Sequence, residues 1–269
     1  MNEMRGKRVL VTGGARGIGL CTAREFARAG SEVIITDIDQ DALDRARTEL
    51  EAGGATVHTR RVDVADRQAV EELAAWVHEE TGALDVLINN AGIGHHAELT
   101  DTSLETWKKL IAVNLMGALH HVYAFLPGMI ERRCGQIVNI SSGQAFFRLP
   151  TWGAYAAVKA ALGVFSEVLH YEVRKHGIRV TTVYPFMVNT GFYDNVESKT
   201  FGSRMSMKLL PYYSTTPERI GHIIFEAVRC RKRVERASLI NTFGLYAQVL
   251  PFAASLIART SNFMLAGRD

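Results

Sequence analysis

The sequence predicts a single α/β domain with a doubly wound, parallel sheet of about seven strands and helices on both of its faces. Strand-like apolar runs alternate with helical patterns along the 269 residues, which is typical of βαβ units. A glycine-rich turn joins the first apolar run to the first helical pattern. Hydrophobic residues make up 47% of the chain, enough to bury both faces of such a sheet. No internal repeat or linker divides residues 1–269, so we expect one domain.

The elements follow from periodicity and from helix start and stop signals. The expected strands are Arg8–Val11, Glu32–Asp37, Thr56–Asp63, Val86–Asn89, Gln136–Ile140, Arg179–Tyr184 and Ala237–Ile240. The expected helices between them are Ile18–Ala29, Gln40–Ala52, Arg67–Thr81, Leu104–Arg132 and Tyr155–His176. Proline disrupts helix interiors, so Pro127 is expected to kink or divide the fourth helix. Thr216 and Pro217 predict a further helix start, with a capping hydroxyl followed by proline in the first turn.

The glycine-rich turn has the spacing Gly13-x-x-x-Gly17-x-Gly19, which differs from the common Gly-x-Gly-x-x-Gly pattern. Glycines let the backbone approach a pyrophosphate, which the free amides of the following helix then bind. Asp37 ends the second expected strand, and an acid there suits a ribose with two free hydroxyls. The alternative is that the glycines only form turns and Asp37 only caps a helix. The order strand, turn, helix, strand, acid favours a dinucleotide site.

Tyr155 and Lys159 lie four residues apart in an expected helix, so their side chains share one helix face. Free tyrosine titrates at about pKa 10, and a neighbouring ammonium favours the phenolate. The pair is therefore a candidate acid-base group at neutral pH. Ser142 lies thirteen residues before Tyr155, at the end of an expected strand. The alternative for the pair is a surface aromatic beside a solvated charge.

Together these motifs resemble the short-chain dehydrogenase/reductase family over nearly the whole chain. Thr12–Gly19 is similar to the family's cofactor turn, Asp63-Val64 to its adenine-contacting pair, and Asn89–Gly92 to the motif that ends its fourth strand. The resemblance implies a Rossmann-type fold, an NAD(P)-dependent oxidoreductase and a catalytic tetrad of Asn114, Ser142, Tyr155 and Lys159. It also implies cofactor contacts from Gly13, Ala15, Arg16, Gly17, Ile18, Gly19, Asp37, Asp63, Val64, Asn90, Ala91, Gly92, Tyr155, Lys159, Pro185, Val188 and Thr190.

The resemblance also implies a role for each member of the tetrad. Tyr155 exchanges a proton with the substrate oxygen while the nicotinamide exchanges hydride with carbon. Lys159 stabilises the phenolate and binds the nicotinamide ribose, and Ser142 hydrogen-bonds the substrate oxygen. Asn114 anchors a water that connects Lys159 to solvent. The structural alternatives are backbone capping by Ser142 and helix capping or bending by Asn114. Asn90 is expected to hold the sheet near the cofactor rather than to perform chemistry.

The cofactor prediction weighs two residues against each other. Asp37 favours NAD because its carboxylate would repel a 2′-phosphate, whereas Arg16 resembles the basic residue of many NADP-dependent relatives. We expect NAD, with NADP as the alternative. Phe186 replaces the glycine that usually follows Pro185 in the family, which narrows the nicotinamide site or displaces the turn. Residues 185–192 are similar to the branch of retinol dehydrogenases and of the 17β-hydroxysteroid dehydrogenases of lipid droplets.

Apolar residues are dense around the catalytic candidates, which predicts a lipophilic alcohol or ketone of steroid, retinoid or long-chain type. The expected pocket residues are Gln144, Phe147, Trp152, Phe186 and Phe192. The alternative is that these residues pack a lid or a subunit interface. Residues 187–214 are expected to form that substrate loop or lid. His95 and His96 either tune substrate binding or are ordinary loop histidines. The rival functions are a 3-ketoacyl thioester reductase and a non-catalytic nucleotide-binding regulator.

Composition and motif content limit the kinds of binding partner and cellular location that we expect for this protein. A net charge of +3 gives no argument for nucleic acid, and three cysteines without metal spacing suit a reducing compartment. A polar start and no apolar run of about 20 residues lead us to expect a cytoplasmic protein. His120 and His121 lack a supporting carboxylate or cysteine pattern, so we expect no metal site. A basic cluster at 229–236 precedes the apolar segment 243–265, which either covers the pocket or attaches peripherally to a membrane. The family resemblance implies a homodimer or homotetramer.

Overall fold

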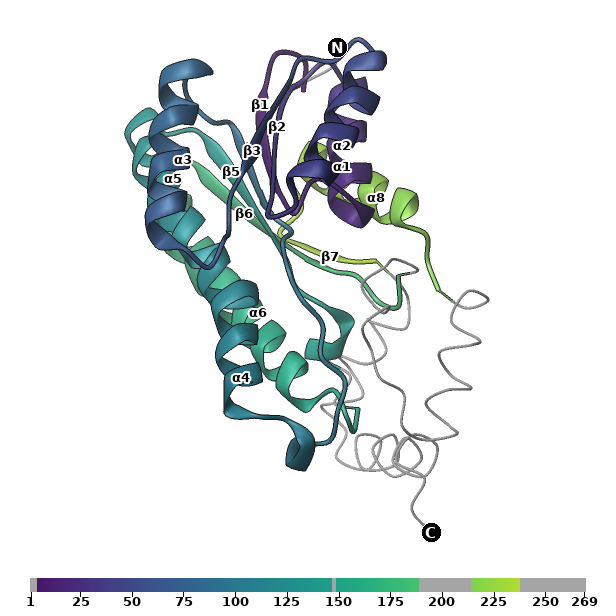
Figure 1. The fold of residues 1–269 in the computed structure, drawn as a ribbon. Coiled ribbons are helices and arrows are strands. Elements are labelled where there is room, and N and C mark those ends of the chain that lie inside the picture. The colour runs from purple at the N-terminus through teal and green to yellow at the C-terminus, as the bar shows by residue number, and fades with distance from the viewer. Residues whose placement is uncertain (1–3, 147–148, 189–213, 238–269) are drawn as a thin grey trace.

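The fold is a parallel seven-stranded sheet with helices on both faces (Figure 1). The computed structural model describes residues 4–146, 149–188 and 214–237. The strand order is β3-β2-β1-β4-β5-β6-β7, and every neighbouring pair is parallel. The strands are β1 Arg8–Thr12, β2 Glu32–Asp37, β3 Val57–Arg61, β4 Val86–Asn89, β5 Gly135–Ile140, β6 Ile178–Tyr184 and β7 Val234–Arg236. The predicted doubly wound α/β class is confirmed.

Helices α1, α2 and α8 cover one face of the sheet, and α3, α5 and α6 cover the other (Figure 1). The helices are α1 Gly17–Arg28, α2 Gln40–Ala52, α3 Arg67–Glu80, α4 Leu104–Ile111, α5 Gly117–Arg132, α6 Gly153–Val173 and α8 Pro217–Arg229. The hydroxyl of Thr216 accepts a hydrogen bond from the amide of Arg219, so the predicted cap of α8 is confirmed.

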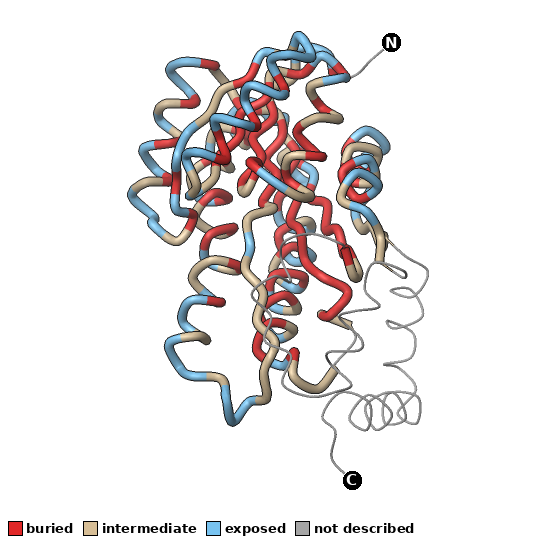
Figure 2. Tube along the Cα trace, turned by 45° about the vertical axis from the view of Figure 1, so that its right-hand side comes forward, coloured by how far each residue is buried: buried red, intermediate tan, exposed pale blue. Residues whose placement is uncertain are grey.

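Alternating residues of the central strands β1, β2, β4, β5 and β6 supply the two cores. In β1, Val9 and Val11 pack with Phe26 of α1 on one face, while Leu10 packs with α3, α5 and α6 on the other. Figure 2 shows the central strands mostly buried and the outer sides of the helices exposed, whereas the edge strands β3 and β7 are only partly buried. The sheet is therefore a rigid platform whose carboxyl edge presents the loops that follow each strand.

The predicted helix 104–132 is interrupted, but not at Pro127. α5 continues through Pro127, and a π-helical segment instead separates α4 from α5 at Ala112–Met116. Pro127 and Tyr123, four residues before it, both lie on the exposed side of α5. Water can therefore bind the Tyr123 carbonyl that lacks an amide partner, which lowers the cost of the proline.

The last strand also differs from the prediction. β7 lies at Val234–Arg236, before the predicted Ala237–Ile240, because Val234 pairs with Thr182 of β6. Residues 238–240 and the apolar segment 243–265 lie outside the described residues, as does most of the expected lid at 187–214. Within the described residues, Leu104–Arg132 is the one helical run long and apolar enough to cross a membrane. Its α5 portion packs on the sheet through Val122, Phe125 and Met129.

Candidate active site

The candidate site lies where the strand order reverses direction. β1 pairs with β2 on one side and with β4 on the other, so the loops after β1 and β4 diverge at the carboxyl edge. A crevice at such a position is the usual ligand site of open α/β sheets. The glycine turn follows β1, and the Asn-Ala-Gly motif follows β4. The topology therefore brings the two predicted cofactor motifs together.

Hydrogen bonds connect these two motifs directly. The side-chain amide of Asn90 donates to the carbonyls of Thr12, at 2.9 Å, and Gly13, at 3.1 Å. The hydroxyl of Thr12 accepts from the amides of Asn90 and Ala91, each at 3.0 Å. A Cβ at Gly19 would lie 2.0 Å from the Gly13 carbonyl oxygen, so only glycine fits there. The prediction that Asn90 holds the sheet edge is confirmed, whereas the anchoring role of Thr12 was not predicted.

The turn and the start of α1 fit a dinucleotide. Gly13 and Gly17 have positive φ angles of 61° and 54°, which residues with a side chain rarely adopt. α1 begins after Arg16 without a side-chain cap and without an acid in its first turn. Its first amides are therefore available to an anion such as a pyrophosphate. Ala15 and Ile18 lie in this same segment, next to the glycines.

Asp37 lies beside the glycine turn, as an acid that binds a ribose must. Its carboxylate accepts from the amide of Ala15 at 3.4 Å and from that of Asp39 at 3.2 Å. The guanidinium of Arg16 lies 3.1 Å from the carboxylate of Asp39 and 3.8 Å from that of Asp37. The alternative of a helix cap is wrong for Asp37, because Asp39 is the residue that caps α2.

The Asp63-Val64 pair is held at the neighbouring edge of the crevice. The carboxylate of Asp63 accepts from the amide of Ala65 at 2.9 Å, and Nδ1 of His120 donates to the Val64 carbonyl at 3.1 Å. A Cβ at Gly117 would lie 2.7 Å from a methyl of Val64, so α5 packs closely against this pair. His120 therefore has a structural contact here.

Tyr155 and Lys159 lie in the first two turns of α6, and both are buried, with 6% and 3% of their surfaces exposed. Nζ of Lys159 lies 5.9 Å from the centroid of the Tyr155 ring and donates to the Ile140 carbonyl at 2.9 Å. Burial lowers the pKa of Lys159 to about 8. The alternative of a surface tyrosine beside a solvated lysine is therefore wrong.

Asn114 lies in the π-helical segment and faces the loop after β4. Its Nδ2 donates to the carbonyls of Ile93, at 3.0 Å, and Leu110, at 3.2 Å, and its Oδ1 accepts from the Ile93 amide at 3.1 Å. A Cβ at Gly92 would lie 2.6 Å from Oδ1 of Asn114 and 3.3 Å from Nζ of Lys159. The structure therefore brings Asn114 and Lys159 together, and it places Asn114 at the helix irregularity as well.

Ser142 follows β5 and begins a short 3₁₀ turn, Gly143–Ala145. Its Oγ accepts from the amide of Gln144 at 3.2 Å, which leaves the hydroxyl hydrogen to be donated elsewhere. The preceding Ser141 donates to the carbonyl of Lys159 at 2.8 Å. The end of β5 is thereby tied to the helix that carries Tyr155. Ser142 therefore caps a backbone amide, as the structural alternative predicts. The hydrogen of its hydroxyl remains available to be donated to a substrate.

The segment after β6 closes this side of the site. The carbonyl of Pro185 accepts from the amide of Gly143 at 2.7 Å, and Val188 pairs with Thr215. Met187 has a φ of 47°, which is strained for a residue with a side chain. Phe186 occupies the position where the family has glycine. The left-handed conformation is adopted by the next residue, Met187. Thr190, Phe147 and Phe192 lie outside the described residues.

Trp152 is the aromatic residue next to the catalytic pair. It is buried, and its ring lies 5.7 Å from that of Tyr155 in an edge-on arrangement. The His96 ring lies 4.9 Å from Trp152, and its Nε2 is hydrogen-bonded to Thr151 Oγ1 at 2.7 Å. Nε2 of His95 is hydrogen-bonded to the hydroxyl of Thr102 at 3.0 Å. His96 therefore supports the loop that carries Trp152, whereas His95 is bound to the segment before α4.

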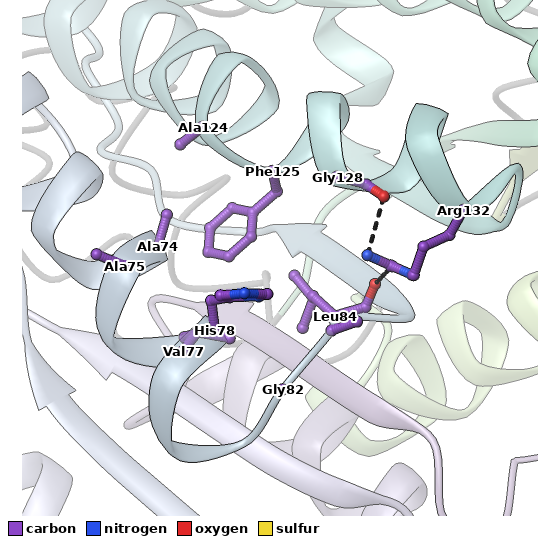
Figure 3. A pocket seen from close by; sticks show the side chains of 11 residues that line it. Ala74, Ala75, Val77, His78, Gly82, Leu84, Ala124, Phe125, Gly128 and Arg132 are labelled. Carbon is purple, nitrogen blue, oxygen red and sulfur yellow. Dashed lines mark hydrogen bonds between the residues drawn. The ribbon is translucent and has the colours of Figure 1, made fainter.

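Two cavities among the described residues lie outside this site. The larger, of about 270 Å³, lies between α3 and α5 (Figure 3), and Arg132 donates there to the carbonyls of Gly128 and Leu84. Leu84 precedes β4, so this cavity lies at the opposite edge of the sheet from the catalytic pair. The smaller, of about 230 Å³, is lined in part by Leu149 and Pro150 before α6. Among the residues that the structure describes, no cluster of three metal-binding side chains occurs.

Known proteins share both the sequence and the fold. A family model described as short chain dehydrogenase matches residues 7–200. The probable oxidoreductase EphD of Mycobacterium tuberculosis is 36% identical over 263 residues, which cover 93% of this chain and 44% of EphD. The chain thus spans less than half of that relative. A dehydrogenase/reductase SDR family protein 7-like of Anopheles gambiae is 33% identical over 231 residues, 84% of this chain and 73% of that protein.

Among solved structures, a short chain dehydrogenase/reductase of Burkholderia phymatum in complex with NAD superposes with a TM-score of 0.87 at 27% identity. The match covers 95% of this chain and 97% of that chain. A second structure, described by its name as a putative short-chain dehydrogenase from Novosphingobium aromaticivorans, has a TM-score of 0.82 at 28% identity. The match covers 94% of this chain and 88% of that chain. The sequence match, the sheet order and the assembled tetrad positions lead to one conclusion: the chain belongs to the short-chain dehydrogenase family of oxidoreductases.

Proposed function

We propose that the protein transfers hydride between NAD and the carbinol carbon of a lipophilic alcohol or ketone, with Tyr155 as the acid-base group. One observation carries this proposal. The ammonium of Lys159 is buried 5.9 Å from the Tyr155 ring, with its pKa lowered to about 8 by burial. A structural role does not require a buried lysine beside a tyrosine, whereas a phenol that exchanges protons near neutrality does.

Each of the four candidate residues has a separate role in the proposed reaction. Bound nicotinamide supplies the hydride acceptor or donor. Tyr155 takes the proton from the substrate hydroxyl during oxidation and returns it during reduction. Lys159 stabilises the phenolate, and the hydroxyl hydrogen of Ser142 stabilises charge on the substrate oxygen. Asn114 holds the loop after β4 against Lys159. As the family resemblance implies, it would also anchor a water through which protons reach solvent.

We propose NAD as the preferred dinucleotide. Asp37 and Asp39 place two carboxylates beside the glycine turn, and both engage Arg16. A 2′-phosphate would meet these carboxylates, and Arg16 would have to leave them in order to neutralise it. The NAD complex of the Burkholderia phymatum relative supports the same choice. NADP dependence is the alternative outcome of the assays below.

Aromatic residues support a lipophilic substrate. Trp152 packs edge-on against Tyr155, and the ring of Phe146, four residues after Ser142, lies 4.5 Å from that of Tyr184. Few polar groups face an apolar ligand in pockets of this kind. The similarity of residues 185–192 to the retinol and 17β-hydroxysteroid dehydrogenases agrees with this class. A turnover panel of steroid, retinoid, long-chain and sugar alcohols tests it, and preference for the sugars would reject it.

The experiment that tests the function compares Tyr155→Phe with Tyr123→Phe. Tyr123 lies 76% exposed on α5 and serves as the matched control. We expect Tyr155→Phe to lower turnover by at least a thousandfold while NAD binding, measured by calorimetry, stays unchanged. Tyr123→Phe should retain turnover. Retained turnover in Tyr155→Phe would reject the mechanism, and NADPH-dependent turnover of a carrier-bound thioester would identify the 3-ketoacyl reductase instead. NAD binding without turnover of any substrate would identify the regulator.

We also propose a homodimer or homotetramer. Val164 and Val168 of α6 are exposed apolar side chains on the outer surface of that helix. Burial of such side chains is a common basis of subunit association. Light scattering of the wild type and of Val164→Asp tests this proposal, and equal monomer masses would reject it.

A further inference from the structure

We propose that Gln144 recognises a second hydroxyl group on the substrate, separate from the hydroxyl that is oxidised. This inference rests on the proposed function, because it concerns the same site. It narrows the substrate class to otherwise apolar molecules with two hydroxyls, or with a hydroxyl beside the reacting carbonyl.

The turn that carries Gln144 is held at both ends. The Gly143 amide donates to the Pro185 carbonyl at 2.7 Å, and the Ala145 amide donates to the Ser142 carbonyl at 3.0 Å. The Gln144 amide itself donates to Oγ of Ser142 at 3.2 Å. These bonds fix the position of Gln144 relative to the hydroxyl that is expected to hold the reacting oxygen. The backbone of Gln144 therefore has a fixed position two residues from Ser142, and we expect its side chain to reach a substrate that is bound to the Ser142 hydroxyl.

The side chain of Gln144 is buried but incompletely paired. Only 5% of its surface is exposed, and its Oε1 has no hydrogen-bond partner among the residues that the structure describes. The amide of Asn114 differs, because its oxygen and its nitrogen both have protein partners. Burial of an unpaired amide oxygen is unfavourable, and native structures keep such groups mainly where a ligand or water completes them.

A hydroxyl is the group that satisfies this amide best. It donates to the amide oxygen and accepts from the amide nitrogen, so it fits either orientation of the side chain. A carboxylate or phosphate would instead require a cation. The buried cation of the site, the Lys159 ammonium, already donates to the Ile140 carbonyl. A neutral group also agrees with the aromatic surroundings provided by Trp152 and Phe146.

The experiment measures kcat/KM with NAD for cyclohexanol and for its 1,2-, 1,3- and 1,4-diols, corrected for the number of hydroxyls. The three diols sample three distances between the hydroxyls. In the wild type we expect at least one diol to exceed cyclohexanol about tenfold. In Gln144→Met, which keeps the length of the side chain without its polar atoms, the ratio of that diol to cyclohexanol should fall to about one. Gln40→Met, a change at an exposed glutamine of α2, should leave the ratio at its wild-type value.

Two results would overturn the inference while the proposed function stands: equal turnover of cyclohexanol and all three diols by the wild type, or a diol preference that Gln144→Met retains. If the wild type oxidises none of these alcohols or the lipophilic panel with either dinucleotide, the proposed function fails and the inference fails with it. The ratio is the decisive quantity because a general distortion of the turn lowers both rates together.

Discussion

Asn114 and Lys159 approach each other at Gly92, although they belong to different helices. A Cβ placed on Gly92 would lie 2.6 Å from Oδ1 of Asn114 and 3.3 Å from Nζ of Lys159. The loop after β4 is thus in direct contact with the polar ends of both side chains. The absence of a side chain at position 92 allows this approach, which makes Gly92 part of the geometry of the site.

The first prediction concerns Gly92→Ala. The added methyl displaces Asn114 or Lys159, and misplacement of catalytic groups by about 1 Å can cost on the order of a hundredfold in rate. We expect kcat to fall by about that factor while the circular dichroism spectrum is unchanged. Gly153→Ala is the control, because a Cβ at Gly153 meets nothing within 4 Å. Equal activity of the two variants would contradict this role of Gly92.

The second prediction concerns the pH dependence of alcohol oxidation. Because burial lowers the pKa of Lys159 to about 8, the Tyr155–Lys159 pair loses its first proton near that pH. The pair accepts a proton from the alcohol only in this deprotonated state, so kcat/KM should rise with pH and level off above about 8. Lys159→Met should move the midpoint upward by more than one pH unit. A midpoint shared by wild type and variant would show that the lysine does not set it.

The third prediction concerns cofactor choice. Asp37→Asn removes the carboxylate that a 2′-phosphate would meet, and it leaves Arg16 with one carboxylate instead of two. We expect the ratio of kcat/KM for NADP to that for NAD to rise at least tenfold, measured with one alcohol. Asp44→Asn makes the same change of charge at an exposed position of α2 and should leave the ratio unchanged. An unchanged ratio in Asp37→Asn would mean that another residue selects the cofactor.

The fourth prediction concerns acid stability. His121 is fully buried in α5, and burial lowers its pKa to about 4; its Nδ1 donates to the Gly117 carbonyl at 2.8 Å. The unfolded chain binds a proton near pH 6.5, whereas the folded protein resists it until about pH 4. Stability is therefore lost as pH falls through this window, by about 2 kcal/mol between pH 7 and pH 5.

Urea unfolding at both pH values measures this loss. His121→Phe should reduce the pH-dependent loss by most of that amount, whatever its effect at pH 7. His78→Phe, at an exposed position of α3, should retain the wild-type difference. An unchanged pH dependence in His121→Phe would show that other groups cause the acid sensitivity.

Much of the architecture was readable from local patterns. A short continuous apolar run identifies β1, and α2 begins and ends at the predicted Gln40 and Ala52. The glycine spacing and the four-residue interval between Tyr155 and Lys159 are also local, because one turn or one helix determines their geometry. The fold class, which is confirmed, and the positions of the candidate cofactor turn and tetrad could therefore be predicted together.

The irregular features were not predictable in this way. The π-helical segment at Ala112–Met116 has no periodic signature, and it depends on bonds from Asn114 to Ile93 in a distant loop. Pro127 fails to end α5 because the carbonyl that it leaves unpaired faces solvent. The anchoring role of Thr12 depends on β4 lying beside β1, a neighbour that the chain order does not reveal.

The sequence by itself predicted the order of strands and helices, the glycine turn expected to bind a dinucleotide and the candidate acid-base pair, because each depends on residues within a few positions of one another. Tertiary structure alone decided that Lys159 is buried with a lowered pKa, that Gly92 adjoins two catalytic side chains, and that Gln144 keeps an unpaired oxygen. Burial and long-range hydrogen bonds arise only when separate strands and helices pack together, so no local pattern encodes them.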